Sequence, residues 1–478
     1  MTRIPRRPLS GRRAHATRAF LLLTLFLVAP FHCRKADGAS RDPGEREAEE
    51  AFVAYLRIDT SNPPGNESAG ARFLQQLLTK NGIESKLVGS DPARQGLYAR
   101  LKANPPSAEK ALILMHHIDV VPATASQWTK PPFSGTRSGG YIWGRGALDV
   151  KSLGIAELMA MLDLKRRGVA LRRDVIFLAV PDEETGGAHG AEMLLRENPE
   201  LFENAGFVLN EGGSNETIVD FVSFWGIEVQ QKVPLWLRVN VDGVGGHAAS
   251  PPDGGGTVAK LVRALAKIEQ LETPYRMSPP VANALAVAAR VRKDPRGAML
   301  RTLKLPLDPR LEAELPQGYR NLLRDTITIT HVSAGNSVNV IPAAATADVD
   351  IRLLPDSSSD EMLKRVQDAV GKDAKIEVLV KGTPVPETSS DTELFRVMSN
   401  AMRAAEPKSA VGPMISLGTT DSRYFRARGI AAYGIAPFKV NYYDADSVHG
   451  VDERMRARFF AEGVRLMRRI VNDFCVRK

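Results

Sequence analysis

The sequence contains only two cysteines, Cys33 and Cys475, among its 478 residues. Two thiols at opposite ends of the chain exclude a framework of several disulfides, which is the usual support of small secreted domains. They also exclude a zinc site built from several thiolates. A metal site in this protein is therefore expected to use imidazole and carboxylate ligands.

The sequence also lacks an apolar run long enough to span a bilayer comfortably. The apolar stretch at residues 19–30 has 12 residues and follows six arginines. A basic segment, a short apolar stretch and small residues at 38–40 are typical of a signal peptide, so we expect an exported protein, periplasmic or secreted. The alternative is an uncleaved N-terminal anchor. The residues before Cys33 fit a lipoprotein signal poorly.

Excess charge is absent from most of the chain, although the net charge is +9. Residues 1–38 carry +7, from eight Lys or Arg and one Asp, which leaves +2 for the remainder. A nearly neutral body does not support a nucleic-acid partner. The sequence shows no internal repeat and no low-complexity tract. A chain of this length is long enough for two or three domains.

Several short motifs contain residues that commonly bind metal ions. Two histidines and three carboxylates stand out, each in a motif with glycine, proline or a second acid beside it. Such a set, with a spare carboxylate next to one ligand, is typical of a two-metal hydrolase. Each motif alone is more often a turn or a core histidine, so the prediction depends on their combination. The candidate ligands are His117, Asp149, Glu184, Glu211 and His449.

Three of these motifs follow apolar runs that predict buried strands, at residues 110–116, 174–180 and 206–209. Ligand sites in open α/β sheets lie beyond the carboxyl ends of the strands. The sequence therefore predicts an α/β fold with a metal site at one sheet edge.

The chemistry of a two-metal site suggests a role for each residue. One carboxylate must bridge the metals, and we assign Asp149 to this position. His117 and Glu211 would complete the ligands of one metal, and Glu184 and His449 would complete those of the other. Glu183 is then free to act as general base towards water. Asp119 is expected to accept the other ring N–H of His117. Zinc suits these ligands, and cobalt or manganese is also possible.

These motifs resemble those of the zinc exopeptidase family that includes aminoacylase, carboxypeptidase S, glutamate carboxypeptidase and succinyl-diaminopimelate desuccinylase. The resemblance extends from about Glu45 to the C-terminus. It implies the same ligands and base as the chemistry above. It also implies a mixed-sheet catalytic domain flanked by helices, with an inserted α+β lid, or dimerisation, domain. The expected divisions are 1–38 signal segment, 44–228 catalytic, 229–385 lid and 386–478 catalytic.

Within the lid, the resemblance implies three strands, at 235–241, 326–332 and 345–352, and a helix at 260–271. Relatives use a histidine of this domain to reach the partner subunit's active site and stabilise the oxyanion, which would be His247 here. Residues 273–325 are expected to enlarge the lid. The resemblance also implies substrate contacts by Asn339, Arg352, Gly418 and Arg423, with a simple ion pair inside the lid as the alternative for Arg352.

Two further expectations come from the resemblance. Asn210 stands where one branch of the family has Asp, and we take Glu211 as the ligand and Asn210 as its neighbour. The Asp149–Val150 bond is expected to be cis, a costly geometry that active sites tolerate.

The sequence thus predicts an exported, dinuclear zinc hydrolase that releases an amino acid from a peptide or an N-acyl amino acid, as a homodimer formed through the lid. Two alternatives remain at this stage. One is a family member that binds a ligand or metal without turnover, and the other is a hydrolase of other, non-peptide C–N bonds.

Overall fold

The computed structural model describes residues 42–477, and the residues from Pro43 onward belong to one compact unit. The expected signal segment, residues 1–38, lies outside the described residues. Among the helices that are described, none has the length and apolar character needed to cross a membrane.

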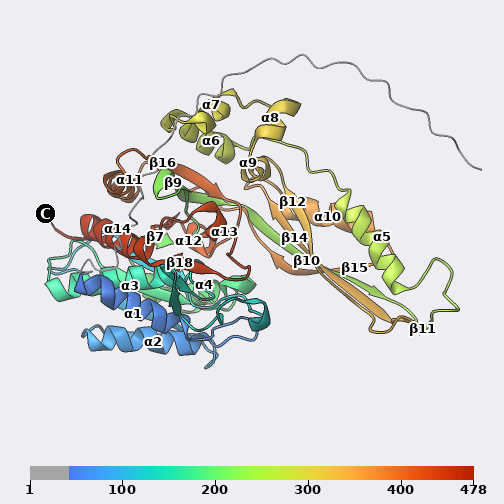
Figure 1. Ribbon diagram of the computed structural model, residues 1–478, viewed down its shortest axis with the longest axis horizontal. Helices are drawn as coiled ribbons and strands as arrows, with labels where there is room; N and C mark the ends of the chain where they lie inside the picture. Colours follow the sequence, from blue (N-terminus) through green and yellow to red (C-terminus); the bar gives the residue numbers. More distant parts are fainter. Residues whose placement is uncertain (1–41, 478) are drawn as a thin grey trace, which may run out of the picture. The chain divides into compact units, whose positions relative to one another are not determined.

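A nine-stranded mixed sheet forms the centre of the catalytic part (Figure 1). Its strands follow the order β1-β2-β6-β3-β7-β17-β9-β16, and β8 pairs with β9 outside this path. Neighbours β6, β3, β7 and β17 run parallel, so their carboxyl ends share one edge. The strands are β1 Ser85–Val88, β2 Gly96–Leu101, β3 Ala111–His117, β6 Val175–Val180, β7 Ala205–Asn210, β8 Ser214–Ile218, β9 Phe221–Gln231, β16 Ala410–Ser416 and β17 Ala431–Gly434.

Helices cover both faces of this sheet, which explains why β3 and β6 are buried along their whole length and apolar apart from the two histidines that end β3. The larger group packs on one face and consists of α1 Pro43–Leu56, α2 Glu67–Lys80, α3 Lys151–Arg167, α11 Glu393–Ala405 and α14 Ala457–Cys475. The opposite face is covered by α4 Ala191–Glu197, η3 Pro199–Phe202 and α12 Ser422–Arg426. Smaller elements are η1 Ala125–Gln127, α13 Tyr442–Ala445, and the sheet of β4 Thr136–Ser138, β5 Tyr141–Trp143 and β18 Arg454–Arg456.

The lid is a four-stranded antiparallel sheet in the order β12-β14-β10-β15. Burial alternates along β14, because one face of the sheet packs on two helices and the other does not. The elements are β10 Val233–Asp242, β12 Thr326–Ala334, β14 Ala344–Leu353, β15 Lys375–Lys381, α5 Thr257–Glu269 and α10 Ser359–Val370. A two-stranded ribbon of β11 Gly246–His247 and β13 Val340–Ile341 lies beyond the end of β10 (Figure 1).

The segment expected to enlarge the lid packs elsewhere. It forms four short helices, α6 Pro279–Val291, α7 Pro295–Thr302, α8 Pro309–Glu314 and α9 Gln317–Leu322. Their apolar side chains contact Phe224 of β9 and Ile415 of β16, at the edge of the central sheet. The buried Arg292 fixes this cluster by a bidentate ion pair with Glu216 of β8, at 2.7 and 2.6 Å. The helices therefore extend the catalytic part of the molecule.

A single residue, Lys232, separates β9 of the central sheet from β10 of the lid. Its side chain is buried, and burial lowers the pKa of its ammonium group to about 7. The Nζ atom donates to the carbonyl oxygens of Asn321 and Arg324 and to Thr326 Oγ1, at 2.9–3.2 Å. Lys232 thus ties the junction to the end of α9.

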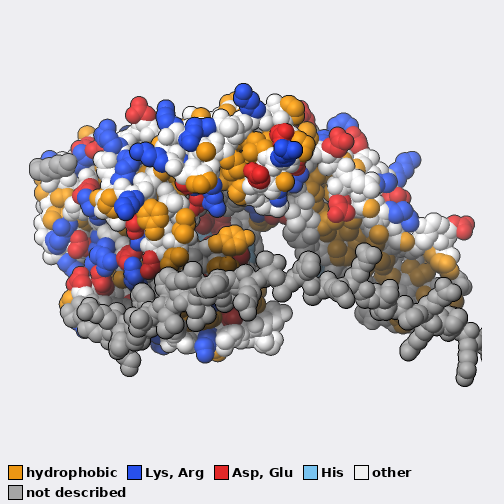
Figure 2. Space-filling model, turned by 45° about the horizontal axis from the view of Figure 1, so that its top comes forward, with side chains coloured by type: hydrophobic (Ala, Val, Ile, Leu, Met, Phe, Trp, Pro, Cys, Tyr) orange, Lys and Arg blue, Asp and Glu red, His pale blue; other side chains and the backbone are white. Residues whose placement is uncertain are grey.

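The predicted strands and helices are confirmed within a few residues. The runs at 110–116, 174–180 and 206–209 form β3, β6 and β7, and the predicted lid strands form β10, β12 and β14. Figure 2 shows Lys and Arg side chains interspersed with Asp and Glu on the face drawn, in keeping with the small net charge of the body.

Candidate metal centre

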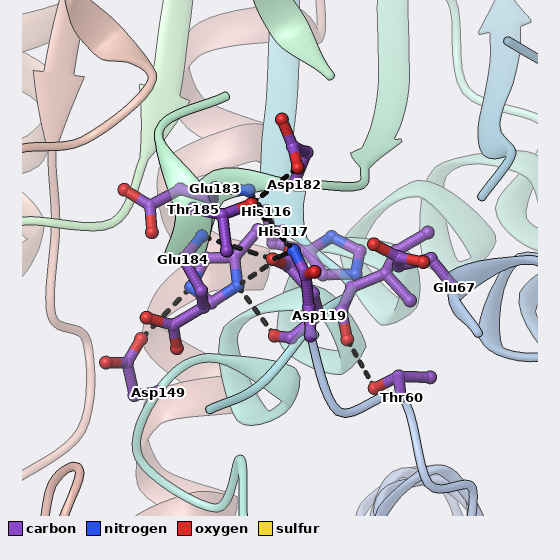
Figure 3. Close-up of polar contacts among 12 residues, drawn as sticks. Thr60, Glu67, His116, His117, Asp119, Asp149, Asp182, Glu183, Glu184 and Thr185 are labelled. Atoms are coloured by element: carbon purple, nitrogen blue, oxygen red, sulfur yellow. Dashed lines mark hydrogen bonds and ion pairs between the residues drawn. The ribbon is translucent and has the colours of Figure 1, made fainter. Parts of the chain in front are cut away.

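Loops at one edge of the central sheet carry all five predicted ligands. His117 ends β3, Glu184 lies in the short η2 helix (Glu183–Thr185) after β6, and Glu211 follows β7. The parallel strands end side by side, so these three side chains meet. Asp149 comes from the turn before α3, and His449 from the loop after α13. Figure 3 shows His117, Glu184 and Asp149 converging.

One imidazole ring lies beside each carboxylate oxygen of Asp149. His117 Nε2 lies 3.0 Å from Asp149 Oδ1 and 3.8 Å from Glu211 Oε1. His449 Nε2 lies 3.0 Å from Asp149 Oδ2 and 3.2 Å from Glu184 Oε2. This arrangement has the pairing expected for two metals with Asp149 between them, and the individual ligand roles remain a prediction.

The electrostatics of the cluster fit a bound cation. Burial and nearby carboxylates raise the pKa of Glu211 to about 8, and they also raise the pKa values of Glu183 and Glu184. Glu184 Oε1 is buried without a hydrogen-bond partner in the described chain. Two groups of three residues each have their potential ligand atoms within 4.8 Å of one another. The first group is His117, Asp149 and Glu184, and the second is His117, Glu183 and Glu211. A metal ion would compensate this concentrated negative charge.

Glu183 and Glu184 are adjacent, yet Figure 3 shows their side chains leaving the turn in different directions. The turn begins at Asp182, which has a left-handed φ of 74°. Its carboxylate accepts hydrogen bonds from Thr185 Oγ1 and His189 N and forms an ion pair with Arg94. These contacts fix the turn, so that Glu184 faces His449 while Glu183 remains available as a base.

Asp119 lies in position to accept the ring N–H of His117, as predicted, and it does so through its backbone oxygen. His117 Nδ1 lies 2.9 Å from the backbone oxygen of Asp119 and 3.7 Å from the side-chain Oδ1 atom of Asp119. The carboxylate instead accepts the backbone N–H groups of Glu183 and Glu184, at 3.2 and 3.1 Å, and the side-chain amide of Asn62. The carbonyl therefore orients His117, and the carboxylate positions the two glutamates.

Glu453 is a buried residue that the sequence analysis missed. Its carboxylate accepts from the backbone N–H groups of Gly146, Leu148 and Asp149, at 2.6–3.1 Å, and pairs with Arg145 at 2.7 Å. It thereby holds the turn that carries Asp149, whose bond to Val150 is cis, as expected. A lone glutamate about 300 residues away in sequence offers no signal for this role.

We expect Glu453→Gln to weaken metal binding by about 10- to 100-fold, because residues that support metal ligands typically have effects of this size. The amide nitrogen would face backbone N–H donors and leave at least one of them unpaired, at a cost of about 1–3 kcal/mol in stability. Metal titration of the purified variant checks the first effect, and thermal unfolding checks the second. Unchanged metal affinity would show that the Asp149 turn holds its shape without Glu453.

Two cavities meet at the ligand cluster. The polar cavity, about 220 Å³, is lined by Glu183, Glu184 and His449 together with Trp236, Arg352 and Arg423. The apolar cavity, about 580 Å³, is lined by Asp149 and Glu211 and then by side chains from β9, β16 and α9. Gly418 borders both cavities. The structure thus places Gly418, Arg352 and Arg423 beside the cluster, as the sequence analysis expected.

The two arginines of the polar cavity differ in their partners. Arg352 forms a bidentate ion pair with Asp350, at 2.7 and 2.9 Å, and donates to Thr419 Oγ1. Arg423 instead donates to the backbone oxygen of Gly186, at 2.6 Å, and to the Tyr424 hydroxyl. Arg352 therefore makes the lid ion pair considered as an alternative above, and it still faces the cavity.

His247 and Asn339 lie together on the ribbon at the lid tip, where the Ala248 N–H donates to the Asn339 backbone oxygen. Both residues are exposed, and neither lines the polar or the apolar cavity. One copy of the chain therefore does not bring them to the metal centre. Asn210 is buried and donates to Ser422 Oγ, which agrees with its interpretation as a neighbour of the ligand Glu211.

Comparisons with known proteins agree with this geometry. The model of "Peptidase family M20/M25/M40" matches residues 113–473. The N-fatty-acyl-amino acid synthase/hydrolase PM20D1 of Bos taurus is 30% identical over 77% of this chain and 74% of its own. Aminoacylase-1 of Sus scrofa is 27% identical over 88% and 93% of the two chains. The M20 family metallo-carboxypeptidase Sso-CP2 of Sulfolobus solfataricus has the same fold, with a TM-score of 0.72, 20% identity and coverage of 90% and 99%. The chain belongs to peptidase family M20/M25/M40, and it is a metallo-amidohydrolase.

Proposed function

We propose that this protein is an exported, dinuclear zinc hydrolase of N-acyl amino acids that carry a large apolar acyl group, and that it acts as a homodimer. The observation that carries the acyl preference is the apolar cavity, which opens directly on Asp149 and Glu211. The basic and apolar segment at residues 1–38 supports export.

The size and lining of the apolar cavity favour an acyl chain over a second amino acid. Its volume of about 580 Å³ lies within the range of sites for small organic ligands, about 300–1,000 Å³. Apolar side chains dominate its walls, among them Phe224, Leu322, Met414, Ile415 and Phe438. Buried apolar surface of this kind stabilises a bound alkyl chain by about 0.8 kcal/mol per methylene group.

The polar cavity on the other side of the cluster suits the amino-acid part of the substrate. Arg352 can donate its remaining N–H groups to a carboxylate, in a charge-assisted hydrogen bond. A substrate that spans both cavities would place its amide carbonyl at the ligand cluster. The names of two relatives, N-fatty-acyl-amino acid synthase/hydrolase and aminoacylase-1, support an N-acyl amino acid as the substrate class.

The residues of the chain then divide the reaction among them. Two zinc ions, when bound, would polarise the amide carbonyl and lower the pKa of water. Glu183 would take a proton from the attacking water and return it to the leaving nitrogen. His247 of a second copy would stabilise the oxyanion, because one copy does not bring it to the centre.

Blocking the apolar cavity should lower activity on substrates with a long acyl chain and have little effect on substrates with a short one. A Cβ added at Gly318 of α9 would meet only Leu417 Cδ1, at 3.7 Å, so a large side chain has room there. We expect Gly318→Phe to reduce kcat/KM for an N-dodecanoyl amino acid by about 10- to 100-fold, because an isolated loss of apolar binding is worth about 1–3 kcal/mol. Activity on the N-acetyl analogue should change by less than about threefold.

The control is Gly318→Ala, which adds a side chain too small to fill the cavity. Equal losses on both substrates in Gly318→Phe would show that the cavity does not receive the acyl chain. A dipeptide series measured in parallel tests the peptidase alternative. Absence of turnover on every amide, with metal bound, would favour the ligand-binding alternative, and turnover of carbamoyl compounds alone would favour other C–N bonds.

A further inference from the structure

We propose that a basic cleft beside the polar cavity binds an anionic side chain of the released amino acid, so that N-acyl glutamate or aspartate is a preferred substrate. The cleft has a volume of about 480 Å³ and lies between β15, α4 and α12. This inference rests on the proposed function and specifies which amino acid it releases.

The cleft adjoins the polar cavity. Gly186, Val380 and Arg423 line both spaces. A substrate whose α-carboxylate faces Arg352 has its side chain free to extend past these three residues. The side chain can therefore reach the cleft while the amide remains at the ligand cluster.

The charges of the cleft favour an anion. Four cationic side chains line it, Arg196, Lys381, Arg423 and Arg428, and Glu192 is the only carboxylate among its described lining residues. A concave site lined mainly by one sign of charge concentrates ligands of the opposite sign. Lys381 and Arg196 have carboxylate partners at the surface, Asp360 and Glu197.

Arg423 and Arg428 form no ion pair with a carboxylate anywhere in residues 42–477. Arg428 Nη1 donates only to the backbone oxygen of Tyr424, at 3.3 Å. Arg423 is 8% exposed, and three hydrogen bonds fix its guanidinium, to Gly186, Thr420 and Tyr424. Two of its five N–H groups remain for a ligand.

The two arginines at the border of the cavities can therefore serve two carboxylates. Arg352 already forms an ion pair with Asp350, and its remaining N–H groups can bind the α-carboxylate that every substrate carries. The charge of Arg423 acts on the pKa of the buried Asp421 without a direct ion pair, and Arg428 has no ion pair in residues 42–477, so both guanidinium groups can contact a second carboxylate. A dicarboxylic amino acid satisfies both positions.

The test compares two substrates of nearly equal shape, N-octanoyl glutamate and N-octanoyl glutamine. We expect wild-type kcat/KM to favour glutamate by about 10- to 100-fold, as for a charge-assisted contact that the neutral analogue lacks. Arg428→Gln should reduce this ratio to within about threefold of unity and leave glutamine turnover unchanged. Free glutamate should inhibit the wild type more strongly than free glutamine, and this difference should shrink in the variant.

The matched control is Arg403→Gln, at an exposed position of α11 that lines none of the three spaces. It should keep the glutamate preference. Equal wild-type turnover of both substrates would overturn the basic-cleft proposal and leave the proposed function intact. Hydrolysis of neither substrate, together with no hydrolysis of N-dodecanoyl amino acids that have neutral or apolar side chains, would instead overturn the proposed function.

Discussion

Glu183→Gln should lower kcat by about two to four orders of magnitude, the usual contribution of a general base, while metal content and thermal stability stay close to the wild type. Glutamine keeps the shape of the side chain and cannot accept a proton from water. In the metal-free protein, the variant also removes a carboxylate whose pKa is raised by burial and by Glu211, so loss of stability is not expected. Steady-state kinetics and metal analysis of the same preparation measure both effects.

The neighbouring substitution Glu184→Gln is the matched control. It removes the carboxylate that lies 3.2 Å from His449, so it should lower metal content as well as activity. The contrast matters because Glu183 also belongs to one of the two groups of three residues that could hold a metal. If Glu183→Gln loses as much metal as Glu184→Gln, then Glu183 is a ligand and the base lies elsewhere.

Mixing two inactive variants should restore activity if the second copy of the chain supplies His247. We expect His247→Ala to lose about 100- to 1,000-fold in kcat, the usual effect of removing one oxyanion donor. After random exchange of subunits with Glu183→Gln, half of the dimers are mixed, and each mixed dimer contains one complete site. The mixture should therefore recover about one quarter of wild-type activity.

The measurement is the activity of the mixture after reversible dissociation, compared with each variant treated alone. A His247→Ala plus Asn339→Ala mixture is the control, because both changes lie on the same ribbon and every site would lack one of the two side chains. No recovery with Glu183→Gln, from protein shown to be dimeric, would contradict the transfer of His247 between subunits.

The strands and the cluster of candidate ligands were predictable because their signals are local. Each ligand motif follows an apolar run, and the parallel order of β3, β6 and β7 brings the ends of these runs together. The chemistry of a two-metal site suggested the roles of Asp149 and Glu183, and the resemblance of the motifs implied the same roles. Local patterns were enough here, since metal ligands are recognised by residue type and by position at a strand end.

Other features depend on contacts between distant parts of the chain. Glu453 reaches Asp149 across about 300 residues, and no pattern beside it marks the contact. Asp119 contacts His117 as predicted, through its backbone oxygen, but the contacts of its carboxylate with the backbone of Glu183 and Glu184 were not predicted. The helices of residues 279–322 were assigned to the lid from their place in the chain, whereas their apolar faces match the edge of the central sheet.

The buried junction at Lys232 connects the lid mechanically to helix α9. The Lys232 ammonium group donates to two carbonyls at the end of α9 and to Thr326 of the lid strand β12, so a rotation of the lid away from α9 must break hydrogen bonds on one side or carry α9 with it. α9 contributes a wall of the apolar cavity, and the lid contributes Arg352 to the polar one. If the substrate spans both cavities as proposed, we therefore expect a movement of the lid towards the amino-acid part to shift the α9 wall beside the acyl chain as well.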